Sequence, residues 1–364
     1  EPSICSGADA CGWGSAMADR KTEFWDIESL SELRHRCQKP GWTLRLFEWL
    51  RWPDGRICPH CKGRDHLPIE GRQKTGLYHC RRCRKQFSAT SDTPLHKTKL
   101  PLETWMEAAF IIASSSKGVS SVILAQQLGV TQPTAWKVGH AIRLMMRPPA
   151  DEPKLSGVVE VDDMALGEDP KRTNRRKYGA KVAKHIYNPP GRGSKKGRIL
   201  AAAERGGRVR AKKMSDGSRA TLDPLVKGMA DQESSLMTDG DKTLVAIGKD
   251  YAAHKSVDHS ADEFARGDAH VNTVEAFHLY VQRAKFGVWH RWSETHQQRY
   301  LDELAFHWDH RPQFRKFEVG GVATRQMIIG ATPIILRMRE LFSKAGGRRL
   351  TRVGRTLKED AHKM

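Results

Sequence analysis

The chain alternates between stretches with helical hydrophobic spacing and short, nearly unbroken apolar runs. Helical spacing predicts helices in residues 24–52 and 102–146. After residue 154, short runs bounded by turn residues predict strands. The strands are Gly157–Asp162, the hairpin pair Ile199–Ala203 and Val209–Met214, and Ser235–Asp239; helices are expected at Leu222–Ala230, Val271–Lys285 and Thr295–His310. This order of elements predicts a mixed α/β domain after a helical segment.

The stretch VSSVILAQQLGVTQPTAWKVGHAIRLMM has the spacing of a helix-turn-helix. Its first helix, Val122–Leu128, is expected to end at Gly129 in the left-handed conformation. Thr131 would cap the second helix, with Pro133 in its first turn. An ordinary helical hairpin would show the same pattern. In a helix-turn-helix, three residues would project toward the major groove and phosphates of DNA: Gln132, Thr134 and Lys137.

The charge balance of the chain predicts a polyanionic partner. The 364 residues include 62 Lys and Arg against 42 Asp and Glu, a formal net charge of +20. Such an excess favours DNA, because each neutralised phosphate releases counterions, although ribosome-associated and membrane-surface proteins share it. No apolar run approaches the ~18 residues of a membrane helix, and the first residues do not resemble a secretory signal. We expect a cytoplasmic protein without a membrane partner.

Four of the seven cysteines form two CxxC pairs, Cys58-Pro-His-Cys61 and Cys80-Arg-Arg-Cys83, with eighteen residues between them. Two such knuckles supply four thiolates to one tetrahedral zinc ion. Four thiolates leave no open coordination position, so the zinc would be structural. The pattern predicts a zinc ribbon.

Residues 171–198 contain eleven Lys or Arg and no acid. A charge run is usually a solvated face, but the complete lack of acids favours contact with phosphates, with little sequence preference. The residues expected to make such contacts include Arg175, Arg176, Lys195 and Lys196.

Three acids stand at positions suited to divalent cations. Asp162 and Asp239 each close an apolar strand, and Glu275 lies in the first turn of the helix Val271–Lys285. Seventy-six residues separate the first pair and thirty-five the second. Two strand-borne aspartates and a helix-borne glutamate suit two Mg²⁺ ions about 3.5–4 Å apart.

Neighbouring polar residues offer alternatives within this site. Asp163 should face the other side of the sheet, Glu160 shares the face of Asp162, and Asp241 has the parity of Asp239. Asn272 is expected to be the helix N-cap, and Glu275 could then serve as the partner of a capping box. A zinc hydrolase is a weaker reading of three histidines: His254, His259 and His270.

From about Leu46 to Arg311 the chain resembles bacterial insertion-sequence transposases with an N-terminal zinc ribbon and a DDE domain, the group related to eukaryotic Merlin elements. The stretches that carry the resemblance are LRWPDGRICPHC, VEVDD, MTDGD, HVNTVEAFHLYVQRA and HQQRYLDELAFHWDHR. The resemblance implies a ribonuclease-H-like fold, magnesium, and the catalytic triad Asp162, Asp239 and Glu275. Asn272 also falls in the active-site motif.

The chain departs from this family at three positions. Asp163 stands where the family often has Glu, and His278 and Gln282 stand where it usually has Trp and Lys. Arg283 remains, and we expect it to take over the phosphate contact of the missing lysine.

The predicted organisation is multidomain. A disordered extension (1–21) precedes a helical lead-in with the zinc ribbon (22–100), a helix-turn-helix segment (101–148), a ribonuclease-H-like domain (155–315) carrying the basic insertion, and a basic tail (316–364). The function expected is metal-dependent cleavage at element ends and joining of the 3′-OH to target DNA, by a nucleoid-associated protein that forms at least a dimer on DNA. A catalytically silent DNA-binding regulator and a nuclease without strand transfer are the alternatives.

Overall fold

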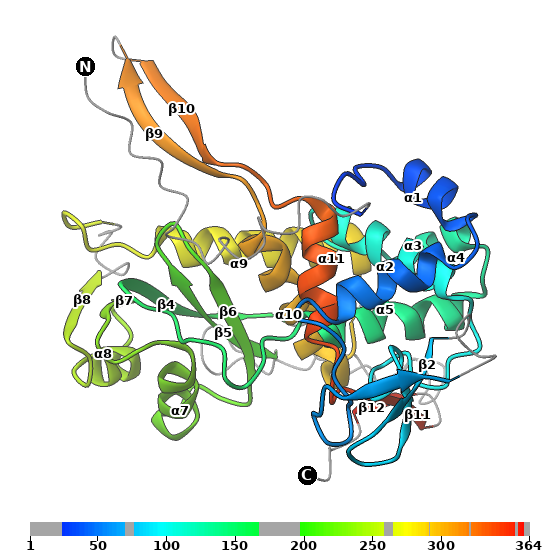
Figure 1. Ribbon diagram of the computed structural model, residues 1–364. Helices are drawn as coiled ribbons and strands as arrows, with labels where there is room; N and C mark the ends of the chain where they lie inside the picture. The colour runs from blue at the N-terminus through cyan, green and yellow to red at the C-terminus, as the bar shows by residue number, and fades with distance from the viewer. Residues whose placement is uncertain are drawn as a thin grey trace, which may run out of the picture. The chain divides into compact units, whose positions relative to one another are not determined.

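The computed structural model describes residues 24–69, 76–166, 197–257, 265–290, 292–319, 322–353 and 356–359. It divides into two compact units, which we present separately (Figure 1). The first contains the described residues up to 114, residues 124–145 and those from 332 onward; the second contains residues 115–123 and 146–331. Some of the residues discussed above lie outside the described ranges. They are the expected extension 1–21, His259, and the insertion residues Arg175, Arg176, Lys195 and Lys196.

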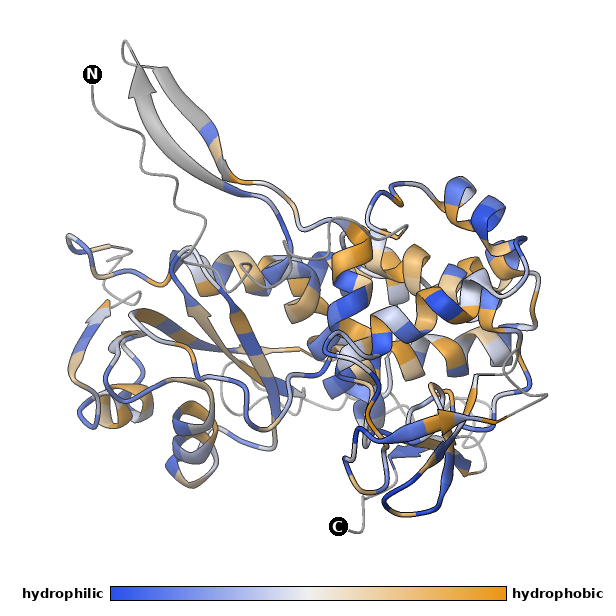
Figure 2. Ribbon diagram, viewed as in Figure 1, coloured by the Kyte–Doolittle hydropathy of each residue, from blue (hydrophilic) through white to orange (hydrophobic). Residues whose placement is uncertain are grey.

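Helices form most of the first unit. Apolar residues recur on one side of α2, so that Leu46, Phe47 and Leu50 are buried. The Phe47 ring meets that of Phe342 on α11 edge-on, with 5.3 Å between centroids. Figure 2 shows the hydrophobic residues of these helices. The helices are α1 (Leu30–Cys37), α2 (Trp42–Arg51), α3 (Leu102–Ser114), α5 (Gln132–Met146) and α11 (Ile334–Ser343).

The expected ribbon is a three-stranded antiparallel sheet in the order β1-β2-β3. Its strands are β1 (His66–Pro68), β2 (Leu77–Cys80) and β3 (Gln86–Ser88). The buried side chains of Tyr78 and Phe87 form its small core with Trp52. Such a core is small, which is why ribbons depend on bound metal for much of their stability.

The helix-turn-helix pattern folds locally as expected. Gly129 has φ +65° between α4 (Ser121–Leu128) and α5, and the Val130 amide donates to the Ala125 carbonyl at 3.1 Å. This is the hydrogen bond of a Schellman helix end, which requires a left-handed residue. Gln132 and Lys137 are exposed and Thr134 is half-buried, so the predicted contact residues are accessible.

The C-terminal residues differ from the expected basic tail. After α11 they form a hairpin of β11 (Leu350–Val353) and β12 (Thr356–Glu359), in which Leu350 and Leu357 are buried. The Gly347 amide donates to the Asp92 carboxylate at 3.1 Å. The prediction of a basic tail rested on the charges of this segment. Its apolar residues, which lie between the cations, attach it to the first unit.

The second unit is built on a mixed five-stranded sheet with the order β6-β5-β4-β7-β8. β4 (Val158–Ala165) is antiparallel to β5 (Arg198–Glu204) and parallel to β7 (Ser235–Asp239). β6 (Val209–Met214) extends one edge and β8 (Ala253–Val257) the other. The expected strands and hairpin are confirmed, except that β4 continues to Ala165 and so has Asp162 inside it rather than at its end. The order is that of a ribonuclease-H-like domain.

Helices cover both faces of this sheet (Figure 1). α7 (Arg219–Met229) and α8 (Lys242–Gly248) pack on the face that contains Val159, Val161 and Leu236. α9 (Asn272–Ala284) and α10 (Gln297–Asp309) pack on the face that contains Met237 and the alternate β5 residues. A π-helical turn (Lys285–Trp289) continues α9, and β9 (Gln313–Val319) pairs with β10 (Val322–Ile329) in a hairpin.

Candidate functional site

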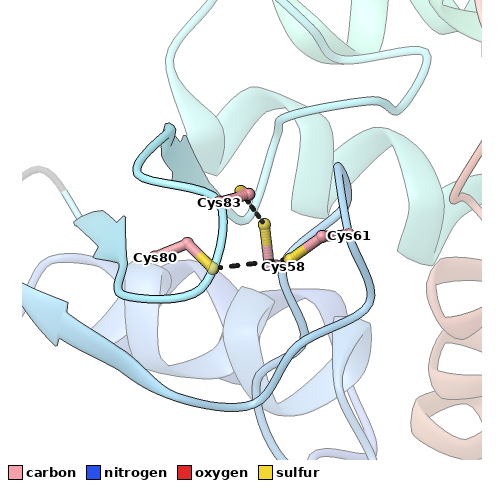
Figure 3. A group of neighbouring side chains, drawn as sticks. All are labelled: Cys58, Cys61, Cys80 and Cys83. Atoms are coloured by element: carbon pink, nitrogen blue, oxygen red, sulfur yellow. Dashed lines mark hydrogen bonds between the residues drawn. The ribbon is translucent and has the colours of Figure 1, made fainter.

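The four cysteines of the ribbon converge (Figure 3). The sulfur atoms of Cys58 and Cys83 lie 3.7 Å apart and those of Cys61 and Cys80 lie 3.6 Å apart, and all four are within 4.8 Å of one another. A tetrahedral zinc ion with bonds of about 2.3 Å to sulfur has sulfur–sulfur edges of about 3.8 Å. The sulfurs therefore already have the spacing that zinc requires.

The knuckle backbone explains this convergence. Lys62 and Arg84 have φ +61° and +58°, and each donates its amide to the carbonyl of the first cysteine of its knuckle, Cys58 or Cys80, at 2.9 Å. These two left-handed residues turn both knuckles toward one point. The second member of each pair, Cys61 or Cys83, then reaches the same point.

The thiols of Cys58 and Cys80 differ in pKa. Burial raises the pKa of Cys58 to about 12, whereas the Cys83 backbone amide, donating to the sulfur of Cys80, lowers the pKa of that thiol to about 7. Because the thiolate is the form that binds zinc, the lowered pKa of Cys80 favours metal binding by its sulfur.

The outer surface of both knuckles is basic. Asp65, the acid between the knuckles in the described part of the ribbon, pairs with Arg81 at 3.8 Å. Metal binding would therefore fix a cationic surface as well as the fold. Its exposed cations are Lys62, Arg64, Arg81, Arg82, Arg84 and Lys85.

In the second unit, Asp162 and Asp239 lie side by side on neighbouring strands. Val161 of β4 pairs in parallel with Thr238 of β7, and each aspartate is the next residue of its strand. Alternation along β7 puts Asp239 on the face of Met237, which packs with α9. Both acids face α9 and both are half-buried.

Glu275 lies in the first turn of α9, on a helix that its apolar residues hold against the sheet. Val274, Phe277 and Val281 are fully buried in the core between α9, α10 and the sheet. Glu275 itself is half-buried. The helix thus carries the third acid to the face that holds Asp162.

The start of α9 differs from the prediction. Asn272 is the first helical residue rather than the N-cap, and the N-cap position is taken by Val271, which has no side-chain cap. The capping acceptor comes from the sheet instead: Glu160 accepts hydrogen bonds from the amides of Thr273 at 2.6 Å and Val274 at 3.1 Å. A capping box between Asn272 and Glu275 is therefore not what starts this helix.

The remaining acids near the site have other roles. Asp163 faces away from α9, as expected, and pairs with Arg198. Asp241 is the N-cap of α8, where it accepts from the amides of Thr243 at 2.8 Å and Leu244 at 3.1 Å. Its capping role leaves Asp239 as the better ligand of the two.

Comparisons with known proteins match the two stretches of chain that contain these residues. Residues 154–309 match the model of the ISXO2-like transposase domain, and residues 43–86 match that of the transposase zinc-ribbon domain. Together the two matches cover more than half of the chain. The chain belongs to this transposase family. An uncharacterized protein in transposable element ISH50 of Halobacterium salinarum is similar, with 24% identity over 288 residues, 75% of this chain and 88% of the relative.

The carboxylates of Asp162, Asp239 and Glu275 have the donor atoms that magnesium prefers, because hard cations bind carboxylate oxygens. They are not gathered as tightly as the cysteines. Among the described residues, the four cysteines are the group of three or more potential ligands whose atoms all lie within 4.8 Å. An open arrangement suits ions that also take ligands from a substrate phosphate.

The histidines do not support a zinc hydrolase. The Nε2 atom of His254 lies 2.9 Å from the Thr238 hydroxyl, and burial lowers the pKa of this histidine. His270 lies next to Glu160, with 3.3 Å between Nδ1 and Oε1. In the described part of the transposase these two rings belong to separate polar contacts.

Two residues of α9 differ from the family pattern in instructive ways. The Nδ1 atom of His278 lies 3.4 Å from Oδ2 of Asp162, and the ring is buried. Gln282 donates its amide to the Met164 sulfur at 3.2 Å, while Arg283 is exposed. The contact of His278 with Asp162 was not predicted from the sequence. The signal that could have indicated it is the position of His278, one helical turn after Glu275.

The described chain of the transposase contains no helix that is both long and apolar enough to cross a membrane.

Proposed function

We propose that the transposase cleaves DNA at the ends of its element and joins the freed 3′-OH to target DNA, with Asp162, Asp239 and Glu275 as the metal ligands. The observation that carries this proposal is the placement of the two aspartates next to each other on parallel strands, with α9 packed on their face. Three oxygen donors from three rigid elements suit two-metal phosphoryl transfer.

In this mechanism Asp162 and Asp239 would hold the ions from the sheet, and Glu275 would supply a further carboxylate ligand from the helix. The bound Mg²⁺ ions would activate the attacking oxygen and stabilise the leaving one. The Asp163 amide donates to Oδ1 of Asp162 at 2.7 Å, and the Asp241 amide donates to Oδ1 of Asp239 at 3.2 Å. These bonds hold each carboxylate in a fixed direction, as ligand-orienting hydrogen bonds do in metal sites.

DNA recognition falls to other parts of the chain. The ribbon, organised by one structural zinc, would present its cations to phosphates. Gln132, Thr134 and Lys137 would contact the terminal repeats, and the insertion 171–198, with Arg175, Arg176, Lys195 and Lys196, would grip the backbone of the DNA. Asn272 and Arg283 would contact the substrate beside the triad.

Because two element ends must be paired, we expect at least a dimer on DNA. The reaction would take place in the cytoplasm, at the nucleoid. The segment boundaries predicted from the sequence (22–100, 101–148 and 155–315) are proposed as the functional modules.

The test uses the full-length protein, a duplex that carries an element end, and a target plasmid. We expect joined products in Mg²⁺ and none in EDTA. Cleavage without joining would identify a nuclease, and end binding without cleavage would identify a regulator; either result would refute the proposed reaction.

A further inference from the structure

The second unit contains a fully buried carboxylate that is not one of the three ligands. The Glu160 side chain is 0% exposed, and both of its oxygens are occupied. Oε2 accepts from the amides of Thr273 and Val274, while Oε1 accepts from Arg205 Nε at 2.7 Å and the Thr273 hydroxyl at 3.1 Å. These contacts join β4, the β5–β6 turn and α9 at one point.

Such an arrangement is not explained by stability alone. A buried carboxylate is costly unless a cation and hydrogen bonds compensate it, and apolar residues of similar volume often serve stability as well. Here the compensation comes from the Arg205 guanidinium and from the N-terminus of α9, where the helix dipole favours an anion. The contacts are directional, so they determine where α9 begins relative to β4.

Arg205 is itself held in place. Its backbone amide donates to the Val158 carbonyl of β4 at 3.1 Å, and its Nη2 donates to the His270 carbonyl at 2.9 Å. The same side chain therefore holds Glu160 and the segment that leads into α9.

A second contact between the same strand and helix lies one turn further on. Asp162, two residues after Glu160 and on the same face of β4, meets His278 of α9 at 3.4 Å. The two contacts, at residues 273–274 and at 278, flank Glu275 on the helix. The position of Glu275 relative to Asp162 is thus fixed from both sides.

We propose that Glu160 and Arg205 form a positioning pair, which sets the separation of Glu275 from Asp162 that divalent metal binding needs. This inference rests on the proposed function for the identity of the ligands. The pair does not touch metal or substrate itself.

The experiment compares Glu160→Gln with Glu204→Gln in the full-length, zinc-loaded protein. Glu204 is the matched control, because it pairs with Arg208 at 3.1 Å on the same turn. Alternation along β5 puts it on the sheet face of Leu200 and Ala202, opposite the face that packs on α9. Arg205→Lys is a second variant. It keeps the positive charge but lacks the guanidinium group that donates to both Glu160 and the His270 carbonyl. Zinc content and thermal unfolding check that each variant folds.

Three quantities are measured: hydrogen exchange of a peptide covering residues 271–278, Mn²⁺ affinity by electron paramagnetic resonance, and the Mg²⁺ dependence of joining. For Glu160→Gln we expect faster exchange at Thr273 and Val274 and about 10-fold to 100-fold weaker Mn²⁺ binding. High Mg²⁺ should restore much of the joining rate. Arg205→Lys should change all three in the same direction by less, and Glu204→Gln should resemble the wild type.

Unchanged exchange and Mn²⁺ affinity in a folded Glu160→Gln protein would overturn the proposal, as would equal losses in Glu204→Gln. Failure of the proposed function has a different signature. In that case the wild type and Glu204→Gln would also lack metal-dependent joining.

Discussion

The transposase has a cysteine cluster suited to zinc and a proposed magnesium site, and the two differ in how they are assembled. In the ribbon, four cysteines of two knuckles already have the sulfur spacing of a zinc tetrahedron. In the second unit, three acids come from two strands and a helix separated by long stretches of chain. Four cysteines would close the zinc site with their own sulfurs, whereas the proposed magnesium site would stay open to a substrate.

This difference teaches how each metal would serve the protein. Four thiolates saturate zinc, so the ribbon can use it only to hold its fold. Carboxylates leave positions on Mg²⁺ that water and phosphate fill, so the acids can use it for chemistry. Loss of a ligand in one region should therefore leave metal binding in the other unchanged.

The largest effect is expected from removing a carboxylate. Glu275→Ala or Asp239→Ala should lower the joining rate by about 10³-fold or more, because loss of a ligand removes several kcal/mol of transition-state stabilisation. Zinc content should stay that of the wild type.

Asp241→Ala is the control for these variants. It removes the N-cap of α8 and should cost about 1 kcal/mol of unfolding free energy while joining continues. Wild-type joining by Glu275→Ala would show that the triad is assigned wrongly.

The next largest effect is expected from the ribbon. Cys80→Ser should abolish zinc binding, measured by atomic absorption, and unfold the knuckles. Affinity for element-end DNA should fall by about 10²-fold as the basic surface loses its arrangement. Mn²⁺ binding at the acids should persist. Cys37→Ser, outside the ribbon, is the control, and an unchanged zinc content in Cys80→Ser would contradict the ribbon assignment.

A smaller effect is expected from the second helix of the helix-turn-helix. Gln132→Ala should reduce discrimination between end and random DNA by about 1–3 kcal/mol. Lys137→Ala should weaken binding to all sequences and lower the slope of log K against log salt by about 1. Titrations at several salt concentrations measure both, and if neither variant changes binding, the segment is an ordinary helical hairpin.

The smallest effect is expected at Gln282. Gln282→Lys restores the cation that the family usually has at this position, so joining should rise by about 2-fold to 10-fold, since one phosphate contact contributes about 1 kcal/mol. Gln282→Met, which has a side chain of similar length but no charge, is the control. A gain of the same size in both variants would exclude a charge effect.

The sequence was sufficient for the ribbon because its ligands are close in the chain and its turns are local. The same holds for Gly129, whose left-handed conformation follows from its place between two helices. The strands that carry Asp162 and Asp239 were also predicted, since buried strands have apolar runs, although β4 continues past Asp162 to Ala165.

Contacts between distant segments could not be predicted in this way. The cap of α9 comes from Glu160, more than one hundred residues earlier, so local rules assigned it to Asn272 instead. The C-terminal hairpin was missed for a similar reason, because charge dominated the reading of a segment whose burial depends on Leu350 and Leu357.

The most direct test of the central claim is iron-mediated cleavage of the protein backbone. Fe²⁺ takes oxygen ligands like those of Mg²⁺, and with peroxide and ascorbate it cuts the chain close to where it binds. We predict cuts near Asp162, Asp239 and Glu275 that excess Mg²⁺ suppresses, with the zinc-filled ribbon intact. Cuts that omit any one of these three segments, or that Mg²⁺ does not suppress, would contradict the account.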